Sequence, residues 1–335
     1  MRKVRAIILK QFGDPGVVAQ PGEIELPSIE PHEALVRMIA APINPADLNV
    51  IEGKYPIRPE LPGVPGGEGI GVVEEVGSAV SDLEVGTLVL VSGTGTWREA
   101  CVVLAEDLVA VPAGVAPEQA AMLRVNPATA LCLLREFVNL QPGDWIVQNA
   151  ANSGVGRAVI QIAHHFGWRT LNIVRRAEAL ADLAGEPGAT HCFVEDEHLP
   201  AAIDGAVRGA PIRLALNAVG GESALALANL LAQGGTIVTY GAMARRPLRI
   251  PNGLLIFKDL AWRGFWVTRW YEQASRAAQA ALFAELIALL QAGVLHSPIE
   301  RIYPLEAASE ALAHASRGAR RGKILFGFDP ALFKV

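Results

Sequence analysis

The chain has 335 residues, 51% of them hydrophobic and 19% charged, with a net charge of −5 and an isoelectric point near 5.9. This length and apolar content suffice for two globular domains with large cores. The acidic balance argues against nucleic acid as a partner, and no apolar run reaches the roughly 18 residues that a membrane helix needs.

The first part of the chain consists of short β-rich runs interrupted by glycine and proline, which predicts a mostly β, barrel-like domain. The basic N-terminal stretch is short and lacks a small-residue cleavage site, so we expect it to form the first strand rather than a targeting peptide. The predicted strands cover residues 4–9, 33–41, 70–76, 87–91 and 99–104.

From about residue 125 onward, helical and strand patterns alternate, which predicts a doubly wound parallel sheet of the Rossmann type. The predicted helices cover residues 126–137, 154–166, 177–184 and 223–231, and the predicted strands cover 145–148, 170–174, 191–194, 212–218 and 236–241. A further aromatic strand is predicted at 260–268 on the sheet edge, where pairing with a second subunit would give a homodimer.

The C-terminal part contains predicted helices at residues 277–291 and 305–315 and predicted strands at 299–302 and 323–326. We expect the last of these elements to return to the β domain. The predicted domains are therefore 1–124 plus 298–335 for the β domain and 125–297 for the inserted nucleotide-binding domain.

The turn after the strand at Trp145–Gln148 resembles a dinucleotide fingerprint, Ala151-Asn-Ser-Gly-Val-Gly156. Only Gly156 stands at a fingerprint glycine position, because Ala151 and Ser153 occupy the first two. Small residues still permit close backbone approach, and the N–H groups at a helix start favour a pyrophosphate. A tight turn without a ligand is the alternative.

The end of the second strand indicates which dinucleotide would bind. A carboxylate that binds the NAD ribose is expected about 20 residues after the fingerprint, but this chain has Arg175 and Arg176. Arginine pairs with a 2′-phosphate, so we expect NADP as the cofactor. The alternative is a solvated arginine pair, and Glu178 lies close in sequence.

The three cysteines, Cys101, Cys132 and Cys192, lie far apart and show no paired spacing of a zinc site or a disulfide framework. We therefore expect buried free thiols, no metal site and a reducing cytoplasmic location.

Taken together, these features resemble the medium-chain dehydrogenase/reductase superfamily, in which a Rossmann domain interrupts a GroES-like β domain. Zinc-dependent members hold their metal with a cysteine and a Gly-His-Glu segment, whereas the corresponding places here are Asn44 and Gly67. The four-cysteine lobe is absent as well. The resemblance thus implies a zinc-independent oxidoreductase.

Longer segments resemble the 2-enoyl thioester reductases of the mitochondrial trans-2-enoyl-CoA reductase type over nearly the whole chain. They are residues 41–49, 53–62, 95–98, 125–130, 148–156, 240–243 and 254–270. The resemblance implies NADPH-dependent reduction of a trans-2-enoyl thioester of CoA or a carrier protein. Hydride would go to Cβ and a proton to Cα.

Two residues are implied in the chemistry. Tyr55 matches the proton donor of these reductases, and a phenol with an ordinary pKa of about 10 is protonated at neutral pH. Trp266 would bound the acyl site. A packing tyrosine on a proline-rich loop is the alternative for Tyr55.

The resemblance also implies a set of NADP-binding residues. They are Asn126 at the nicotinamide, Asn152, Ser153, Gly154, Val155 and Gly156 at the pyrophosphate, Arg175 and Arg176 at the 2′-phosphate, Tyr240, Gly241, Ala242 and Met243 along the groove, Phe265, Trp266 and Val267 around the nicotinamide, and Lys323 at a phosphate. Phe265 and Trp266 would otherwise pack in a dimer interface. Lys323 would otherwise share a solvated basic face with Arg317, Arg320 and Arg321.

Two departures from the reductase pattern leave other functions open. Arg175-Arg-Ala177 replaces an arginine-acid-arginine pattern, and the segment before Gly95-Thr-Trp97 is shorter. The first alternative is a zinc-free NADPH:quinone or enone oxidoreductase, which would not need a proton donor at Tyr55. The second is a nucleotide-binding protein with a structural or regulatory role.

Overall fold

The computed structural model of the chain describes residues 2–93, 95–318 and 320–333. It divides into two compact units. The first contains the residues up to 125, then 283–291 and the stretch from 296 onward, and the second contains 126–282 and 292–295. The predicted Rossmann domain, 125–297, includes all of helix α10 (Arg276–Gln291), whereas the second half of this helix groups with the first unit.

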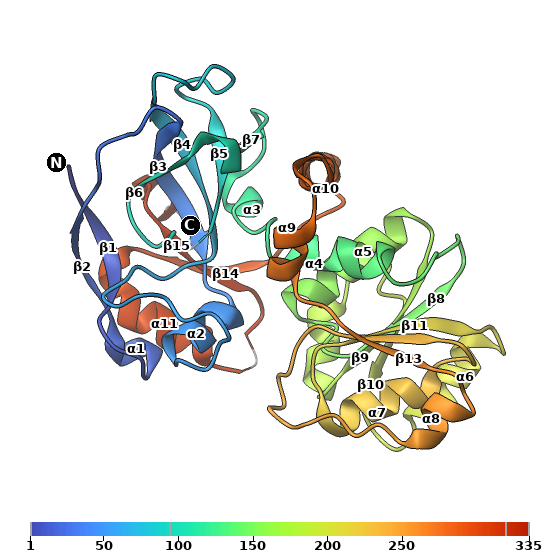
Figure 1. Cartoon of the computed structure of the whole chain (residues 1–335). Helices are drawn as coiled ribbons and strands as arrows, with labels where there is room; N and C mark the ends of the chain where they lie inside the picture. The colour runs from blue at the N-terminus through green and yellow to red at the C-terminus, as the bar shows by residue number, and fades with distance from the viewer. Residues whose placement is uncertain (1, 94, 319, 334–335) are drawn as a thin grey trace. The chain divides into compact units, whose positions relative to one another are not determined.

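The first unit is built on a mixed sheet with strand order β14-β15-β3-β4-β5-β7, in which β6 also pairs with β3 (Figure 1). Its strands are β3 (Glu33–Pro42), β4 (Glu68–Val76), β5 (Leu88–Ser92), β6 (Ala100–Leu104), β7 (Val109–Val111), β14 (Ile299–Tyr303) and β15 (Lys323–Gly327). Strand β15 pairs antiparallel with β3, so the C-terminal segment does return to the β domain as predicted.

A separate antiparallel pair joins β1 (Lys3–Leu9) to β2 (Ala19–Glu25), and sequence patterns did not predict β2. The helices of this unit are α1 (Pro15–Val18), α2 (Pro45–Ile51), α3 (Pro117–Ala120) and α11 (Ala308–Ser316). Proline begins each of the first three, where its missing N–H costs no helical hydrogen bond. Helix α11 packs against α1 and α2 around a core that includes the fully buried Trp97 and Phe326.

The second unit is a parallel sheet with strand order β10-β9-β8-β11-β12-β13. Its strands are β8 (Trp145–Gln148), β9 (Arg169–Val174), β10 (His191–Val194), β11 (Ile212–Asn217), β12 (Thr236–Thr239) and β13 (Ala261–Gly264). This order confirms the predicted Rossmann topology. The order reverses between β8 and β11, which is where such sheets bind dinucleotides.

Helices cover both faces of this sheet, with α4 and α5 on one face and α6 and α7 on the other (Figure 1). The helices of the unit are α4 (Asn126–Arg135), α5 (Gly154–His165), α6 (Leu199–Val207), α7 (Gly221–Leu230), α8 (Asn252–Ile256) and α9 (Val267–Gln273). Residues 177–184, predicted as an α-helix, form instead a 3₁₀ helix over Ala177–Leu183.

The predicted strand at 260–268 is wrong in its second half. Strand β13 lies at the sheet edge as expected but ends at Gly264, and helix α9 begins at Val267. The pairing continues only to Phe265, whose N–H donates to the Thr239 carbonyl at 2.9 Å. A short apolar run does not distinguish strand from helix by periodicity, which explains the error.

Candidate functional site

The fingerprint turn has the geometry of an anion site. Ser153 caps helix α5, and its Oγ accepts the Gly156 N–H at 3.1 Å. The N–H groups of Gly154 and Val155 have no acceptor within the helix, because they begin it. A Cβ on Gly156 would lie 2.5 Å from the Ala151 carbonyl oxygen, so this glycine is sterically required. The turn therefore fits a cofactor diphosphate.

Asn126, the first residue of α4, lies against this turn. A Cβ on Gly154 would be 3.1 Å from Asn126 Cγ, so the predicted nicotinamide residue and the fingerprint are neighbours within the second unit. The Asn152 side chain points elsewhere, since its Nδ2 donates to Asp182 Oδ2 at 3.1 Å. Asn152 can therefore offer the cofactor its backbone more readily than its amide.

The segment Tyr240 to Met243 follows the carboxyl end of β12, along the loop that leaves β11. The Tyr240 N–H donates to the Asn217 carbonyl and the Met243 N–H to the Ala218 carbonyl, both at 3.0 Å. A Cβ on Gly241 would lie 2.7 Å from the same Ala218 oxygen, so the close approach requires glycine. Ala242 and Met243 are exposed, and the segment lies just beyond the carboxyl end of a parallel strand.

An amide network holds these strand ends together, and sequence analysis did not find it. Asn149 Nδ2 donates to Asn217 Oδ1 at 2.9 Å and to Ser223 Oγ at 3.0 Å, while its Oδ1 accepts the Ala218 N–H at 2.7 Å. Asn217 Nδ2 donates to Thr239 Oγ1 at 3.0 Å. Both asparagines are fully buried. Asn149 follows a strand and Asn217 ends one, and this position at strand ends is the only feature in the sequence that could have indicated the network.

The remaining predicted cofactor residues of this unit lie at strand ends or just beyond them. Arg175 and Arg176 follow β9 and are exposed. The Phe265 ring stands edge-on to Phe137, with centroids 5.9 Å apart. Trp266 immediately precedes α9 and Val267 begins it, and both side chains are half-buried. All of them lie on the carboxyl side of the parallel strands, where ligands bind.

Tyr55 belongs to the first unit and is half-buried in the loop after α2. The end of α2 anchors this loop, because the Lys54 N–H donates to the Asn49 carbonyl at 2.8 Å. Arg58 donates to the Gly53 carbonyl at 3.1 Å, and Gly53 has a φ of 69°, which favours glycine. The loop that carries the predicted proton donor is thus braced on both sides of Tyr55.

A buried charged cluster surrounds Asn44, one of the two residues that the family resemblance sets at zinc-ligand positions. Asn44 Nδ2 donates to Glu68 Oε1 at 2.7 Å, and Asn44 Oδ1 accepts from Lys323 Nζ. Asp47 Oδ2 accepts the Asn44 N–H at 2.7 Å, and Glu68 Oε2 accepts the Val125 N–H at 2.9 Å. Lys323 therefore does not lie on a solvated basic face, although the neighbouring Arg317 and Arg321 are exposed.

Burial governs the titration of this cluster. It raises the pKa of Asp47 to about 7 and raises the pKa of Glu68, because the charged forms lose their hydration. It lowers the pKa of Lys323 to about 8 for the same reason. The attraction between Lys323 and Glu68 opposes the pKa shift of each of these two groups. Burial therefore favours the uncharged forms of all three side chains.

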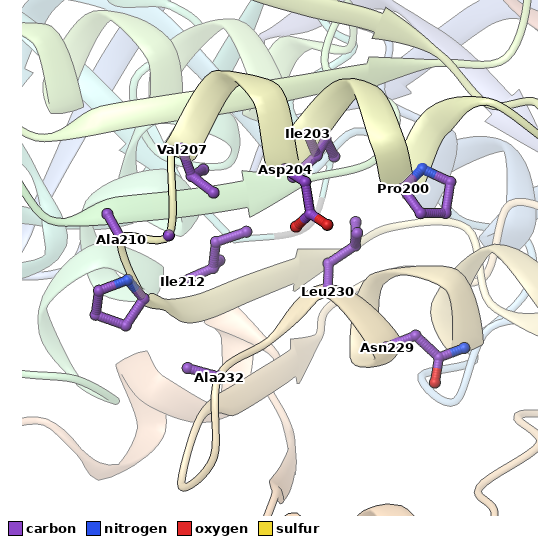
Figure 2. A pocket seen from close by; sticks show the side chains of 11 residues that line it. Pro200, Ile203, Asp204, Val207, Ala210, Ile212, Asn229, Leu230 and Ala232 are labelled. Atoms are coloured by element: carbon purple, nitrogen blue, oxygen red, sulfur yellow. The ribbon is translucent and has the colours of Figure 1, made fainter.

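A separate hollow of about 390 Å³ lies in the second unit (Figure 2). It is lined by Pro200, Ile203, Asp204, Val207, Gly209, Ala210, Pro211, Ile212, Asn229, Leu230 and Ala232. Because Ile212 begins β11, the hollow lies at the amino end of that strand. Dinucleotides bind at the carboxyl ends of such strands, so this hollow is not the cofactor site.

Within the described ranges, no group of three or more histidine, cysteine, aspartate or glutamate side chains is placed to hold a metal ion. None of the helices in the same ranges has the length and apolar content to cross a membrane.

Comparison with known proteins assigns both units. Residues 30–113 match the alcohol dehydrogenase GroES-like domain family, and residues 154–284 match the zinc-binding dehydrogenase family. The mitochondrial enoyl-(acyl-carrier-protein) reductase of Rattus norvegicus is 43% identical over 315 residues, which cover 92% of this chain and 84% of that protein.

Two solved structures share the fold over nearly the full length. The mitochondrial 2-enoyl thioester reductase Etr1p/Etr2p heterodimer of Candida tropicalis is 28% identical with a TM-score of 0.88, covering 98% of this chain and 100% of that one. The quinone oxidoreductase of Pseudomonas syringae pv. Tomato is 27% identical with a TM-score of 0.86, covering 97% and 99%.

These comparisons overturn one expectation. The cytoplasmic location inferred from the cysteines and the N-terminal residues is wrong, because the rat and Candida relatives are mitochondrial proteins. The reductase resemblance is confirmed, since the identity to the rat protein extends over both units. The chain belongs to the medium-chain dehydrogenase/reductase superfamily and, within it, to the mitochondrial-type enoyl-(acyl-carrier-protein) reductases.

Proposed function

We propose that this protein reduces the C2=C3 double bond of a trans-2-enoyl thioester with NADPH. The observation that carries the proposal is the 43% identity to the rat enoyl reductase over 92% of the chain. A second line of support is Etr1p, 29% identical to this chain, which has been solved with NADP and crotonyl-CoA. The substrate is accordingly an acyl thioester of CoA or of a carrier protein.

The fingerprint supports NADPH as the cofactor. When bound, NADPH supplies the hydride that is added to Cβ. Ser153 and the first N–H groups of α5 present donors to its diphosphate, and Asn126 lies beside them. Arg175 and Arg176 offer two guanidinium groups to the 2′-phosphate, so we expect NADPH to be preferred over NADH.

Tyr55 is the proposed proton donor to Cα. Its phenol delivers the proton that the enolate needs once Cβ has accepted the hydride, and it hydrogen-bonds the developing charge. The loop anchored to α2 holds the side chain in place. Trp266, at the start of α9, is proposed to bound the acyl site, while Phe265 and Val267 flank the nicotinamide.

The experiment that tests this function follows NADPH consumption with crotonyl-CoA, with a quinone and NADH as controls. We expect thioester reduction that prefers NADPH, and a Tyr55→Phe variant that turns over about 10²- to 10⁴-fold more slowly while binding NADPH normally. An unaffected variant would remove Tyr55 from the chemistry. Turnover of the quinone alone would exclude the thioester.

That last outcome would favour the second candidate, a zinc-free NADPH:quinone oxidoreductase. The shared fold with the Pseudomonas quinone oxidoreductase, at a TM-score of 0.86, supports it. Such an enzyme would use the same fingerprint and arginines but would not depend on the Tyr55 hydroxyl.

A homodimer formed through β13 is a further part of the proposal. Strand β13 is last in the sheet order of the second unit, and β12 pairs with only one of its edges. The exposed Ile256 and Phe257, at 68% and 82%, lie just before it in the chain. Light scattering is expected to give the dimer mass, and a monomer at micromolar concentration would refute this assembly.

A further inference from the structure

The hydroxyl group of Tyr240 is buried inside the second unit without a hydrogen-bond partner. Its Oη is inaccessible to solvent and makes no hydrogen bond to any part of the chain that the structure describes. The backbone around it is well fixed, since the Tyr240 N–H donates to the Asn217 carbonyl at 3.0 Å. Native structures rarely keep a buried hydroxyl unpaired, so this one needs an explanation.

The Ser153 hydroxyl is the polar group that acts most directly on this phenol. Burial raises the pKa of Tyr240 well above its usual range, and the Ser153 hydroxyl opposes that rise. The two hydroxyls thus face each other without reaching hydrogen-bond geometry. Ser153 is also the cap of α5, so the unpaired phenol is directed at the start of the proposed anion site.

The hydrogen-bonding capacity of Ser153 makes a completed contact possible. A serine hydroxyl has one hydrogen to donate and two lone pairs. One lone pair already accepts the Gly156 N–H at 3.1 Å. The second lone pair is available to a phenol O–H, and the hydrogen is available to an anion at the helix start.

We propose that Tyr240 is a positioning residue of the dinucleotide site, whose hydroxyl completes its hydrogen bond to Ser153 when a diphosphate engages the start of α5. This inference rests on the proposed NADPH-dependent function. An anion that accepts the Ser153 hydrogen polarises the Ser153 oxygen, which strengthens the bond that Tyr240 donates. With its two lone pairs occupied by Gly156 and Tyr240, Ser153 can only donate toward the cofactor.

The test uses the full chain and the Tyr240→Phe variant, which lacks only the phenol oxygen. Without cofactor, the variant should melt at the same or a higher temperature, because it loses a buried group that has no partner. Its dissociation constant for NADPH, followed by nicotinamide fluorescence, should rise about threefold to tenfold. Combined with Ser153→Ala, which itself weakens binding, Tyr240→Phe should have no further effect on that constant.

Tyr303→Phe is the matched control. The Tyr303 hydroxyl has partners in the first unit, His314 Nδ1 at 3.0 Å and Glu310 Oε1 at 3.3 Å. Its removal should lower the melting temperature and leave NADPH binding unchanged. The opposite signs for the two tyrosines distinguish a hydroxyl that binds cofactor from one that stabilises the fold.

Three results would overturn the inference. A lower melting temperature with unchanged NADPH binding would make the Tyr240 hydroxyl structural, and no change in either quantity would leave it without a role. A wild-type chain that does not bind NADPH would refute both this inference and the proposed function. A chain that binds NADPH but does not reduce enoyl thioesters would refute the function alone.

Discussion

Lys323 gives the sharpest test of the buried cluster in the first unit. The substitution Lys323→Met keeps the length and apolar stem of the side chain but removes the ammonium group that contacts Asn44 and faces Glu68. Glu68 is fully buried, so its carboxylate would lose its strongest attraction to a cation and keep only the weaker one to Arg124. Removing one partner of a buried ion pair costs about 3–5 kcal/mol. Because Glu68 would keep its hydrogen bonds from Asn44 Nδ2 and from the Val125 N–H, we expect the lower end of that range, about 3 kcal/mol.

The assay is urea unfolding of the full chain at pH 7, followed by intrinsic tryptophan fluorescence, to which the deeply buried Trp97 contributes with the five other tryptophans. Arg321→Met is the control, because the Arg321 side chain is exposed and such substitutions change stability by about 0.5 kcal/mol or less. In the double variant Lys323→Met/Glu68→Gln, the uncompensated charge is gone. We therefore expect much of the lost stability to return.

A contrary result would reassign Lys323. If Lys323→Met unfolds at the same urea concentration as the wild type but binds NADPH more weakly, the lysine serves a cofactor phosphate, as the family resemblance implied. If the double variant is less stable than either single variant, the cost does not come from an unpaired charge on Glu68. Either result would refute the electrostatic reasoning.

Two further predictions concern charge. Arg175→Gln combined with Arg176→Gln should raise the KM for NADPH about tenfold or more, because charge-assisted bonds to the 2′-phosphate are lost. The KM for NADH should stay nearly unchanged, and equal effects on both cofactors would contradict this prediction. For Asp47, burial raises the pKa to about 7 in the folded state, so the folded chain binds more protons than the unfolded chain between about pH 4 and 7. The stability of the wild type relative to Asp47→Asn should therefore fall as pH rises through that window and level off above it. Thermal melts of both proteins measure this, and a difference in melting temperature that stays constant with pH would mean that Asp47 titrates normally.

The fold was predictable where the chain has strong local patterns. Strands β8 and β10 have the predicted bounds, and the alternation of helices and strands predicted the parallel sheet. Strand β2 (Ala19–Glu25) was missed because Pro21 and Gly22 interrupt it, and both disfavour strands. Its antiparallel pairing with β1 holds it together, which is a tertiary contact that no local pattern reports.

The site was predictable in its backbone and not in its side-chain partners. The sequence singled out Gly156 as the one glycine at a fingerprint position, and a Cβ there would lie only 2.5 Å from the Ala151 carbonyl oxygen. The network between Asn149 and Asn217 was missed because the two residues are 68 positions apart. Asparagine is also a common turn residue, so only the sheet order shows that the two meet.

The buried position of Lys323 also depends on a pairing between residues far apart in the sequence. In the sequence it stands beside arginines, which suggests a basic face, yet its partner Asn44 is 279 residues away. The two meet because β15 pairs with β3 in a register that sets Leu325 opposite Pro42. An asparagine at 44 can accept from an ammonium and donate to a carboxylate at once, which a metal-binding thiolate cannot do. The buried acids Asp47 and Glu68 need a nearby cation in either case. Where the zinc ligands are absent, the lysine supplies that charge, so Asn44 and Lys323 are expected to tolerate substitution only together.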